Sequence, residues 1–392
     1  MRILILQYAG DYGETVKLLA AGGDETYYAQ KYSVDAVAEI AKKVDEVTTL
    51  CCLTEKPYNE MLDNGVRAIG MGFSDQFSTK ELLKKIEEYQ PTHLIVRMPD
   101  RATVDWAIKR RVKTILTLAD SFSPKGLRNK IRNFQLANLL NNKQIDWIGN
   151  HGISASLSLR DIGVNPNKII PWDWPSTTTP NSFAPKTLPS EQKTWDILYV
   201  GAINEAKGIG DAIEAISILK SKGLSIRLKV AGKGPIESFL IQAKRLEVEK
   251  EVKFLGLLPH KTIIPLMNEA DVVLVPSRHE YPEGFPMTIY EALCSRTPIV
   301  ASDHPMFCKN LSHQTNALIF PAGDSRRLAI CIEKLLSAPE LYENLSLASY
   351  ETWKNLQLPV KWAELINRWL FDSPENQQWL FEHRLSSGKY RE

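Results

Sequence analysis

The most informative segment of this chain is residues 271–292, which read DVVLVPSRHEYPEGFPMTIYEA. Its first residues, Asp271–Val275, form a short apolar, β-branched run that is typical of a buried strand. A polar segment follows, and Pro286 then suits the first turn of a helix, where its missing N–H is not needed. The segment therefore predicts a strand, a loop and a helix in succession, which is the unit that builds parallel α/β sheets.

The same alternation of short apolar runs and longer amphipathic runs extends through the chain in both directions. Strands are predicted at Arg2–Gln7, Thr48–Leu53, His93–Met98, Thr114–Leu118, Trp147–Asn150, Ile197–Val200, Arg227–Ala231, Val252–Leu255, Val272–Val275, Ile299–Ala301 and Ala317–Phe320. Helices are predicted between them, among others at Tyr28–Val44, Asn129–Lys143, Asp211–Lys222 and Met287–Cys294. Strands that alternate with helices form βαβ units, so the sequence predicts an α/β protein with two doubly wound, Rossmann-like domains.

A proline-rich segment separates the two halves of this pattern. Four prolines fall between Trp172 and Thr194, and repeated proline opposes both helices and sheet ladders. We therefore expect an N-terminal domain over residues 1–175, an extended linker over 176–194, a C-terminal domain over 195–355, and C-terminal helices over 356–392. These last helices are rich in tryptophan and must bury that surface. Docking back on the N-terminal domain is the expected arrangement, and contact with a partner or a membrane surface is the alternative.

The composition excludes several classes of protein. The 392 residues include 48 Lys+Arg and 46 Asp+Glu, a net charge of +2, which argues against nonspecific nucleic-acid binding. No run reaches the roughly 20 apolar residues of a transmembrane helix, and the apolar N-terminus is too short for a signal peptide. The five cysteines show no CxxC spacing, which favours a reducing compartment. The expected location is the cytoplasm, with the inner face of a membrane as the alternative.

Glycine and lysine recur where the predicted strands of the second half end. Residues 199–208 read YVGAINEAKG, and residues 231–235 read AGKGP. A lysine such as Lys207 at the start of a helix places a cation beside free backbone amides, which suits a diphosphate; a solvated surface lysine is the alternative. Neither run is a GxGxxG dinucleotide fingerprint, so an NAD-dependent enzyme is not expected.

Two glutamates flank the turn Gly284–Phe285–Pro286. Glu283 precedes the turn, and Glu291 lies about a turn and a half into the predicted helix. A carboxylate at this edge can accept two hydrogen bonds from the vicinal hydroxyls of a sugar, although a favourable interaction with the helix dipole is the alternative. Gly284 allows the backbone to approach a ligand closely, and the amides of the turn can donate to hydroxyl or phosphate oxygens.

In this order, the motifs resemble the C-terminal domain of the retaining GT-B glycosyltransferases of family 4, whose E-x7-E signature matches Glu283 and Glu291. The resemblance covers about Trp195–Leu336. It implies two doubly wound domains that face a cleft. It also implies a hexosyltransferase-like enzyme that moves a sugar from a nucleotide-diphosphate sugar to a glycan, lipid or small-molecule acceptor. By the same resemblance, the anomeric configuration is retained and neither a metal ion nor a cofactor is needed.

The resemblance also implies roles for individual residues. Lys207 would neutralise the diphosphate of the donor, Glu283 with the amides of Gly284, Phe285 and Pro286 would hold the transferred sugar, and Glu291 would hold the nucleotide ribose. Three glycines would line the donor site: Gly201, Gly232 and Gly234. A glycine-rich loop with Gly10, Asp11 and Gly13 would let donor and acceptor approach the first strand; a turn without chemistry is the alternative.

Two alanines depart from the family pattern. Ala202 stands where the family has arginine, so Lys233, Arg278 or an N-terminal residue must supply the missing positive charge. Ala119 stands where the family has histidine, and the nearest replacements are Asp120 and, on the following strand, Asn150 and His151, although His151 also suits a structural role. The residues expected to be catalytic are therefore Lys207, Glu283, Asp120 and His151. The departures keep open a catalytically weakened GT-B binding or regulatory subunit. A nucleotide-sugar epimerase is a further alternative.

The acceptor is expected to contact N-terminal loops at Tyr58–Phe77 and Pro124–Arg132. The second of these holds a basic cluster formed by Lys125, Arg128, Lys130 and Arg132. Such a cluster could meet an anionic lipid or polysaccharide, and a solvated helix face is the alternative. Peripheral contact with a membrane therefore stays open.

Overall fold

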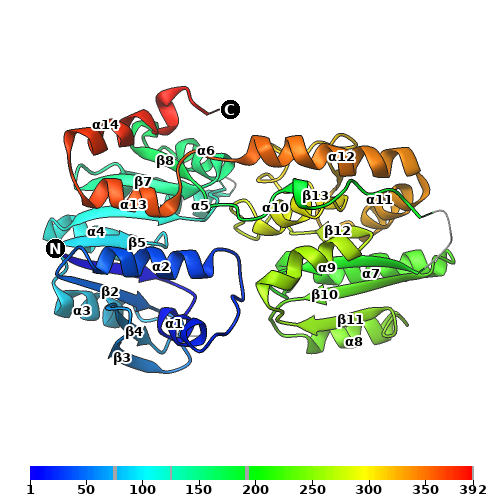
Figure 1. Cartoon of the computed structure of the whole chain (residues 1–392), viewed down its shortest axis with the longest axis horizontal. Helices are drawn as coiled ribbons and strands as arrows, with labels where there is room; N and C mark the ends of the chain where they lie inside the picture. The colour runs from blue at the N-terminus through cyan, green and yellow to red at the C-terminus, as the bar shows by residue number, and fades with distance from the viewer. Residues whose placement is uncertain (74–76, 124–125, 190–193, 391–392) are drawn as a thin grey trace. The chain divides into compact units, whose positions relative to one another are not determined.

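The computed structural model describes the chain apart from residues 74–76, 124–125, 190–193 and 391–392, and it divides into two compact units (Figure 1). The N-terminal unit comprises Met1–Glu25, Ala29–Pro175 and Leu358–Glu392, and the C-terminal unit comprises Thr26–Tyr28 and Ser176–Gln357. The tryptophan-rich end of the chain thus belongs to the N-terminal unit. No described helix is long and apolar enough to cross a membrane.

The N-terminal unit contains an eight-stranded sheet in the order β3-β4-β2-β1-β5-β6-β7-β8. Its strands are β1 (Arg2–Gln7), β2 (Glu46–Cys51), β3 (Pro57–Met61), β4 (Arg67–Met71), β5 (His93–Val96), β6 (Lys113–Leu118), β7 (Ile145–His151) and β8 (Ile169–Trp172). All neighbours are parallel except β3 and β4. The prediction that Tyr58–Phe77 is a loop is therefore wrong for most of its described residues, which belong to β3 and β4. The sequence does not reveal β3, because it is a largely exposed edge strand without the apolar run of a buried strand.

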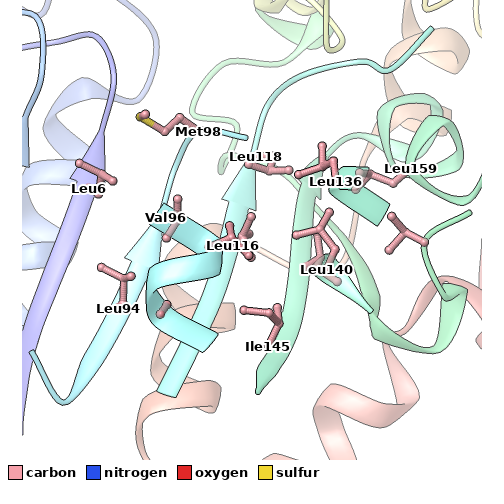
Figure 2. Packing of buried hydrophobic residues seen from close by; sticks show 14 of the residues in the cluster. Leu6, Leu94, Val96, Met98, Leu116, Leu118, Leu136, Leu140, Ile145 and Leu159 are labelled. Atoms are coloured by element: carbon pink, nitrogen blue, oxygen red, sulfur yellow. The ribbon is translucent and has the colours of Figure 1, made fainter. Parts of the chain in front are cut away.

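Helices cover both faces of this sheet. One face carries α1 (Tyr12–Ala20), α2 (Gln30–Ala41), α13 (Trp362–Leu370) and α14 (Pro374–Glu382), and the other carries α3 (Thr79–Tyr89), α4 (Arg101–Arg110), α5 (Leu127–Leu140) and α6 (Ile153–Asp161). The side chains of β1 alternate between these faces, as in any strand: Ile3 lies in one apolar cluster and Leu4 in the other. Figure 2 shows the second cluster, in which Leu136 and Leu140 of α5 pack with Leu116.

The C-terminal unit contains a six-stranded, fully parallel sheet in the order β11-β10-β9-β12-β13-β14. Its strands are β9 (Trp195–Val200), β10 (Ile226–Ala231), β11 (Val252–Gly256), β12 (Val272–Val275), β13 (Ile299–Ser302) and β14 (Leu318–Phe320). Its helices are α7 (Ile209–Ser221), α8 (Glu237–Arg245), α9 (Ile263–Glu269), α10 (Met287–Cys294), α11 (Ser325–Ser337) and α12 (Pro339–Leu356). The two parallel-sheet units confirm the predicted α/β class.

The described part of the predicted linker, residues 176–189, lies along the C-terminal unit. The ammonium group of Lys186 donates to the backbone carbonyls of Asn268, at 2.7 Å, and Ala270. Nε of Arg296 donates to the carbonyl of Pro180 at 2.8 Å. These bonds fix a proline-rich segment that has few backbone partners of its own. Residues 190–193 lie outside the described part of the chain.

Candidate active site

The sheet of the C-terminal unit has a point where the direction of winding changes. From β9 the chain moves outward to β10 and β11, and it then returns to β12 on the other side of β9. Open α/β sheets bind ligands beyond the carboxyl ends of their strands at such a point. Lys207 ends the short 3-10 helix η3 (Glu205–Lys207) after β9, and Glu283 follows β12. The topology therefore places both residues where a ligand is expected.

Lys207 and Glu283 form an ion pair at this switch point. Nζ of Lys207 donates to Oε1 of Glu283 at 2.5 Å, and Oγ of Ser277 donates to the same oxygen at 2.6 Å. The two charged side chains are only 13% and 6% exposed, so water screens the pair weakly. The ammonium group also lies 4.2 Å from the centroid of the Tyr281 ring, a cation–π contact. The site thus combines a cation suited to phosphate with a carboxylate suited to sugar hydroxyls.

Glycines bring the loops that follow β9, β10 and β12 into close contact. A Cβ atom on Gly232 would lie 1.8 Å from the carbonyl oxygen of Gly201, and one on Gly208 would lie 2.2 Å from that of Pro276. A Cβ atom on Gly234 would also meet a carbonyl oxygen, at 2.1 Å. Side chains cannot occupy these positions without moving backbone. Of the glycines predicted to line the site, Gly232 and Gly234 therefore allow the loop after β10 to pack against the loop after β9.

The substitution Gly232→Ala is expected to lower the free energy of unfolding by about 3 kcal/mol, because its methyl group overlaps a fixed carbonyl. Chemical denaturation measures this loss. Gly223→Ala is the matched control, since Gly223 also has a positive φ of +85° but nothing within 4 Å of an added Cβ; about 1 kcal/mol is expected there. Equal losses at both positions would contradict the packing described above.

The turn after Glu283 ends at the start of α10. Pro286 is the N-cap residue, and among the described residues no side chain caps this helix. The Ile289 N–H donates to the Pro286 carbonyl at 3.0 Å, so the amides of Met287 and Thr288 are the ones at the helix start that a ligand can use. Phe285 is buried and packs edge-on against Tyr290 with ring centroids 5.2 Å apart, which fixes the turn. Pro286 has no N–H, and its predicted share in amide donation is therefore wrong; Gly284, Phe285, Met287 and Thr288 have the backbone N–H groups that could donate in this turn.

Glu291 lies in the second turn of α10 and is buried. Its Oε1 lies 2.7 Å from Nε2 of His260, which begins the 3-10 helix η4 (His260–Thr262) after β11. This contact orients the carboxylate. Sequence reasoning missed His260 because it precedes Glu291 by 31 residues, and only the fold brings the two together.

Two cations of the C-terminal unit could replace the arginine expected at Ala202, and they differ in their partners. Arg278 donates to both carboxylate oxygens of Asp211, at 2.8 and 2.7 Å, and a guanidinium nitrogen lies 2.7 Å from the Glu205 carboxylate. The Asp211 hydrogen bonds raise the pKa of Arg278 further. Arg278 is thus committed to acidic partners, whereas Lys233 is exposed in the glycine-lined loop after β10.

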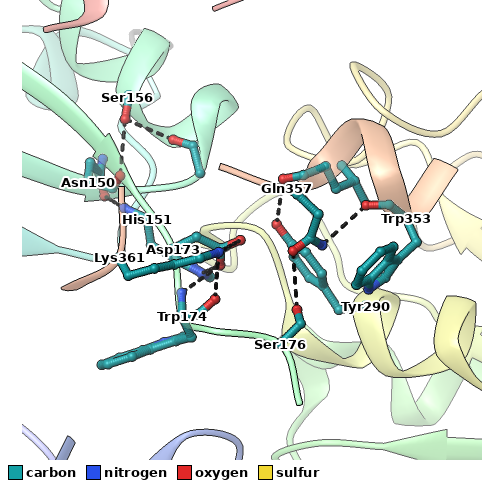
Figure 3. A network of polar contacts seen from close by, with 12 residues as sticks. Asn150, His151, Ser156, Asp173, Trp174, Ser176, Tyr290, Trp353, Gln357 and Lys361 are labelled. Carbon is teal, nitrogen blue, oxygen red and sulfur yellow. Dashed lines mark hydrogen bonds and ion pairs between the residues drawn. The ribbon is translucent and has the colours of Figure 1, made fainter. Parts of the chain in front are cut away.

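His151 belongs to a buried network in the N-terminal unit (Figure 3). Its Nε2 lies 3.0 Å from Oδ1 of Asp173, and its ring packs against Trp172 with centroids 5.1 Å apart. Nζ of Lys361 lies 3.9 Å from the other oxygen of Asp173, and burial lowers the pKa of this lysine. These contacts favour the structural interpretation of His151.

Asp120 follows β6 at the carboxyl edge of the N-terminal sheet. Nδ2 of Asn150 donates to its backbone carbonyl at 2.9 Å, and burial raises the pKa of its carboxyl group. Asp120 and His151 thus lie in the N-terminal unit, while Lys207 and Glu283 lie in the C-terminal unit. Of the four residues predicted to be catalytic, Lys207 and Glu283 contact each other directly.

The glycine-rich loop after β1 is shorter than expected. Helix α1 begins at Tyr12, and Oδ1 of Asp11 caps it by accepting from the Glu14 N–H at 3.1 Å. Gly13 is therefore helical, which corrects the prediction that it lies in a loop, and a Cβ on it would come within 2.8 Å of the Tyr58 hydroxyl. Gly10, with a φ of +88°, remains in the turn.

Arg97 is a polar residue that sequence reasoning missed. It follows β5 beside β1, where the winding of the N-terminal sheet changes direction. Its Nη1 donates to Oε1 of Gln7 at 3.3 Å, and its guanidinium lies 5.3 Å from the Trp362 ring centroid. No glycine pattern marks this position, so only the sheet order reveals it.

Comparison with known proteins gives this arrangement a family context. Residues 181–352 match the family model described as glycosyl transferases group 1. Over 160 residues the chain is 32% identical to the amylovoran biosynthesis glycosyltransferase AmsK of Erwinia amylovora, an alignment that covers 40% of this chain and 39% of that protein. Over 146 residues it is 33% identical to a glycogen synthase of Mycobacterium tuberculosis, covering 37% of this chain and 32% of the relative. The matched segment is thus less than half of each curated relative.

Solved structures resemble the chain over most of its length. Sucrose-phosphate synthase from Thermosynechococcus elongatus superposes with a TM-score of 0.65 at 18% identity, covering 91% of this chain and 94% of that one. Anabaena HepE in complex with UDP-glucose gives a TM-score of 0.62 at 17% identity, covering 97% and 98%. These similarities confirm the GT-B fold. The family match adds that residues 181–352 are similar to group 1 glycosyl transferases.

Proposed function

We propose that this protein is a retaining glycosyltransferase that moves a sugar from a nucleotide-diphosphate sugar to a glycan, lipid or small-molecule acceptor, without a metal ion or another cofactor. The observation that carries the proposal is the Lys207–Glu283 pair at the switch point of the C-terminal sheet. This pair lies within the segment that matches group 1 glycosyl transferases.

Lys207 has the position and charge to stabilise the leaving group. Transfer breaks the bond between the anomeric carbon and a phosphate oxygen, and the diphosphate gains negative charge as it leaves. A preorganised cation in a weakly screened site stabilises this charge more in the transition state than in the bound donor. In the retaining reaction that we propose, the acceptor oxygen bonds to the anomeric carbon on the face that the phosphate leaves. The acceptor's proton passes to the leaving phosphate oxygen.

The two glutamates would bind the two ends of the donor. Glu283, beside Lys207, would accept from hydroxyls of the transferred sugar. Glu291 would accept from the ribose hydroxyls, held in place by His260 at 2.7 Å. On this view His260 is a positioning residue, because it acts through Glu291.

The substitution His260→Ala is expected to raise the KM for the donor about tenfold while changing kcat little, since a misoriented carboxylate weakens ground-state binding. His260→Gln, which keeps an N–H donor near Glu291, is expected to recover much of the loss. Steady-state kinetics at varied donor concentration gives both constants. A fall in kcat with an unchanged KM, or no recovery in the glutamine variant, would contradict the positioning role.

A binding or regulatory subunit with weakened catalysis is the second candidate. It is favoured by Ala202 and by the engagement of Arg278 with Asp211 and Glu205, which leave the phosphate site short of cations. In the enzyme that we propose, Lys233 supplies the missing charge. Lys233→Ala tests this assignment, because it lowers donor affinity only if Lys233 contacts the diphosphate; turnover, measured below, separates the two candidates.

The direct test of the proposed reaction is a panel of nucleotide sugars, starting with UDP-glucose, incubated with the purified protein with and without acceptor sugars. Release of nucleoside diphosphate together with a glycosylated product is expected, and NMR of the product reports the anomeric configuration. Inversion would overturn the retaining mechanism. An isomerised donor without acceptor would instead indicate an epimerase, and binding without turnover would indicate the weakened subunit.

A further inference from the structure

Helix α5 has apolar residues on two faces. Its sequence is LRNKIRNFQLANLL, and its inner face packs on the sheet through Leu136 and Leu140 (Figure 2). The opposite face is in solvent: Leu127, Ile131 and Phe134 are 75%, 53% and 65% exposed. Residues at i, i+4 and i+7 follow one line along a helix. These three side chains, the α5 stripe, therefore form a continuous apolar surface that no described element covers.

Basic residues lie on both sides of the α5 stripe. At 100° per residue, Lys130 falls on one side of it and Arg128 and Arg132 fall on the other. All three are exposed, and α5 contains no aspartate or glutamate. Within the described part of the chain, none of the three has an acidic partner. Lys125, the fourth member of the cluster predicted from sequence, lies outside the described residues.

We infer that α5 docks the protein on the surface of an anionic lipid bilayer. An apolar stripe with flanking cations is the pattern of a helix that lies in the membrane interface, with its apolar side chains below the headgroups and its cations among them. An anionic polysaccharide would use the cations but not the stripe. A second copy of the chain would place two basic helices against each other. Charge and apolar surface together therefore favour lipid.

The position of α5 gives this surface a consequence for function. The helix follows the carboxyl end of β6, so its exposed first turns lie toward the edge of the N-terminal sheet that carries Asp120. A bilayer on α5 would present membrane-embedded acceptors toward that edge. This consequence rests on the proposed transferase activity, whereas the binding to lipid does not.

Co-sedimentation with vesicles tests the inference without donor or acceptor. The full-length protein is expected to bind vesicles of phosphatidylcholine with phosphatidylglycerol, to bind pure phosphatidylcholine weakly, and to dissociate as salt rises. Replacing Leu127, Ile131 and Phe134 together by serine is expected to lower the partition coefficient about tenfold for each side chain that leaves the lipid. Replacing Arg128, Lys130 and Arg132 by glutamine is expected to lower the partition coefficient about fivefold for each cation removed.

A matched control is available in helix α8, where Leu240 and Ile241 are 46% and 70% exposed. Leu240→Ser with Ile241→Ser should leave vesicle binding unchanged, and the circular dichroism spectra of the α5 variants should match that of the wild-type protein. Equal binding by every variant would overturn the inference. So would a stripe-dependent change of oligomeric state in light scattering without vesicle binding, or binding to dextran sulfate in place of vesicles.

Discussion

Replacing Lys207 by alanine is expected to lower the rate of sugar transfer by about two to three orders of magnitude, the loss typical when one preorganised charge stabiliser is removed. The ammonium group is held 2.5 Å from Glu283 and 4.2 Å from the Tyr281 ring centroid, so little in the site can move to replace it. The measurement is kcat/KM for the donor identified in the nucleotide-sugar panel. Lys222→Ala removes a cation from the more exposed pair with Glu333 and should leave kcat/KM unchanged.

The same substitution also bears on stability. It leaves Glu283 buried without its cation, which is expected to cost about 3 kcal/mol of unfolding free energy. The double variant Lys207→Ala with Glu283→Gln removes both charges and should recover much of that stability while staying inactive. Such a result separates the catalytic role of Lys207 from its structural role. Wild-type activity in folded Lys207→Ala protein would refute the assignment.

Replacing Glu291 by alanine is expected to weaken nucleotide binding by about ten- to a hundredfold, because hydrogen bonds to a charged group contribute about 1.5–3 kcal/mol. The carboxylate is buried and already oriented by His260, so it binds a diol with little loss of side-chain entropy. Calorimetric titration of the nucleoside diphosphate measures the change in Kd.

Comparison of ligands shows whether the ribose is the group that Glu291 holds. The loss of affinity in Glu291→Ala should appear with a nucleoside diphosphate and be absent with inorganic pyrophosphate, which has no ribose. Glu291→Gln keeps one acceptor oxygen and should show an intermediate Kd. An equal loss for both ligands would show instead that the substitution damages the site as a whole.

Much of the fold could be predicted because buried strands carry their own signal. The ranges Arg2–Gln7 and Val272–Val275 match β1 and β12 residue for residue, since each strand is apolar and buried. The edge strand β3 has no such run, and its pairing with β4 depends on contacts that local pattern does not encode. Helix α5 begins at Leu127 rather than at the predicted Asn129, so the prediction that Pro124–Arg132 is a loop is wrong from Leu127 on. Its N-cap residue is Gly126, which has no side chain to mark the start in the sequence.

The candidate site likewise contains residues that the sequence predicts and residues that it does not. Lys207 and the two glutamates could be found from motif spacing, because each follows a strand whose end is visible in the sequence. The partners that set their properties could not. Asp211, which engages Arg278, is 67 residues away from it, and His260 reaches Glu291 only through the fold. The sequence identifies side chains that are able to bind a donor, while tertiary contacts decide which of these side chains are already engaged by other residues.

The central claim is that the switch point of the C-terminal sheet binds the diphosphate of a nucleotide sugar through Lys207. Calorimetric titration of UDP, GDP and ADP into the wild-type chain and into Lys207→Ala tests this most directly. One nucleotide should bind the wild-type protein well, and its affinity should fall by at least about tenfold in the variant. No measurable binding of any nucleotide, or equal affinity in the two proteins, would contradict the claim.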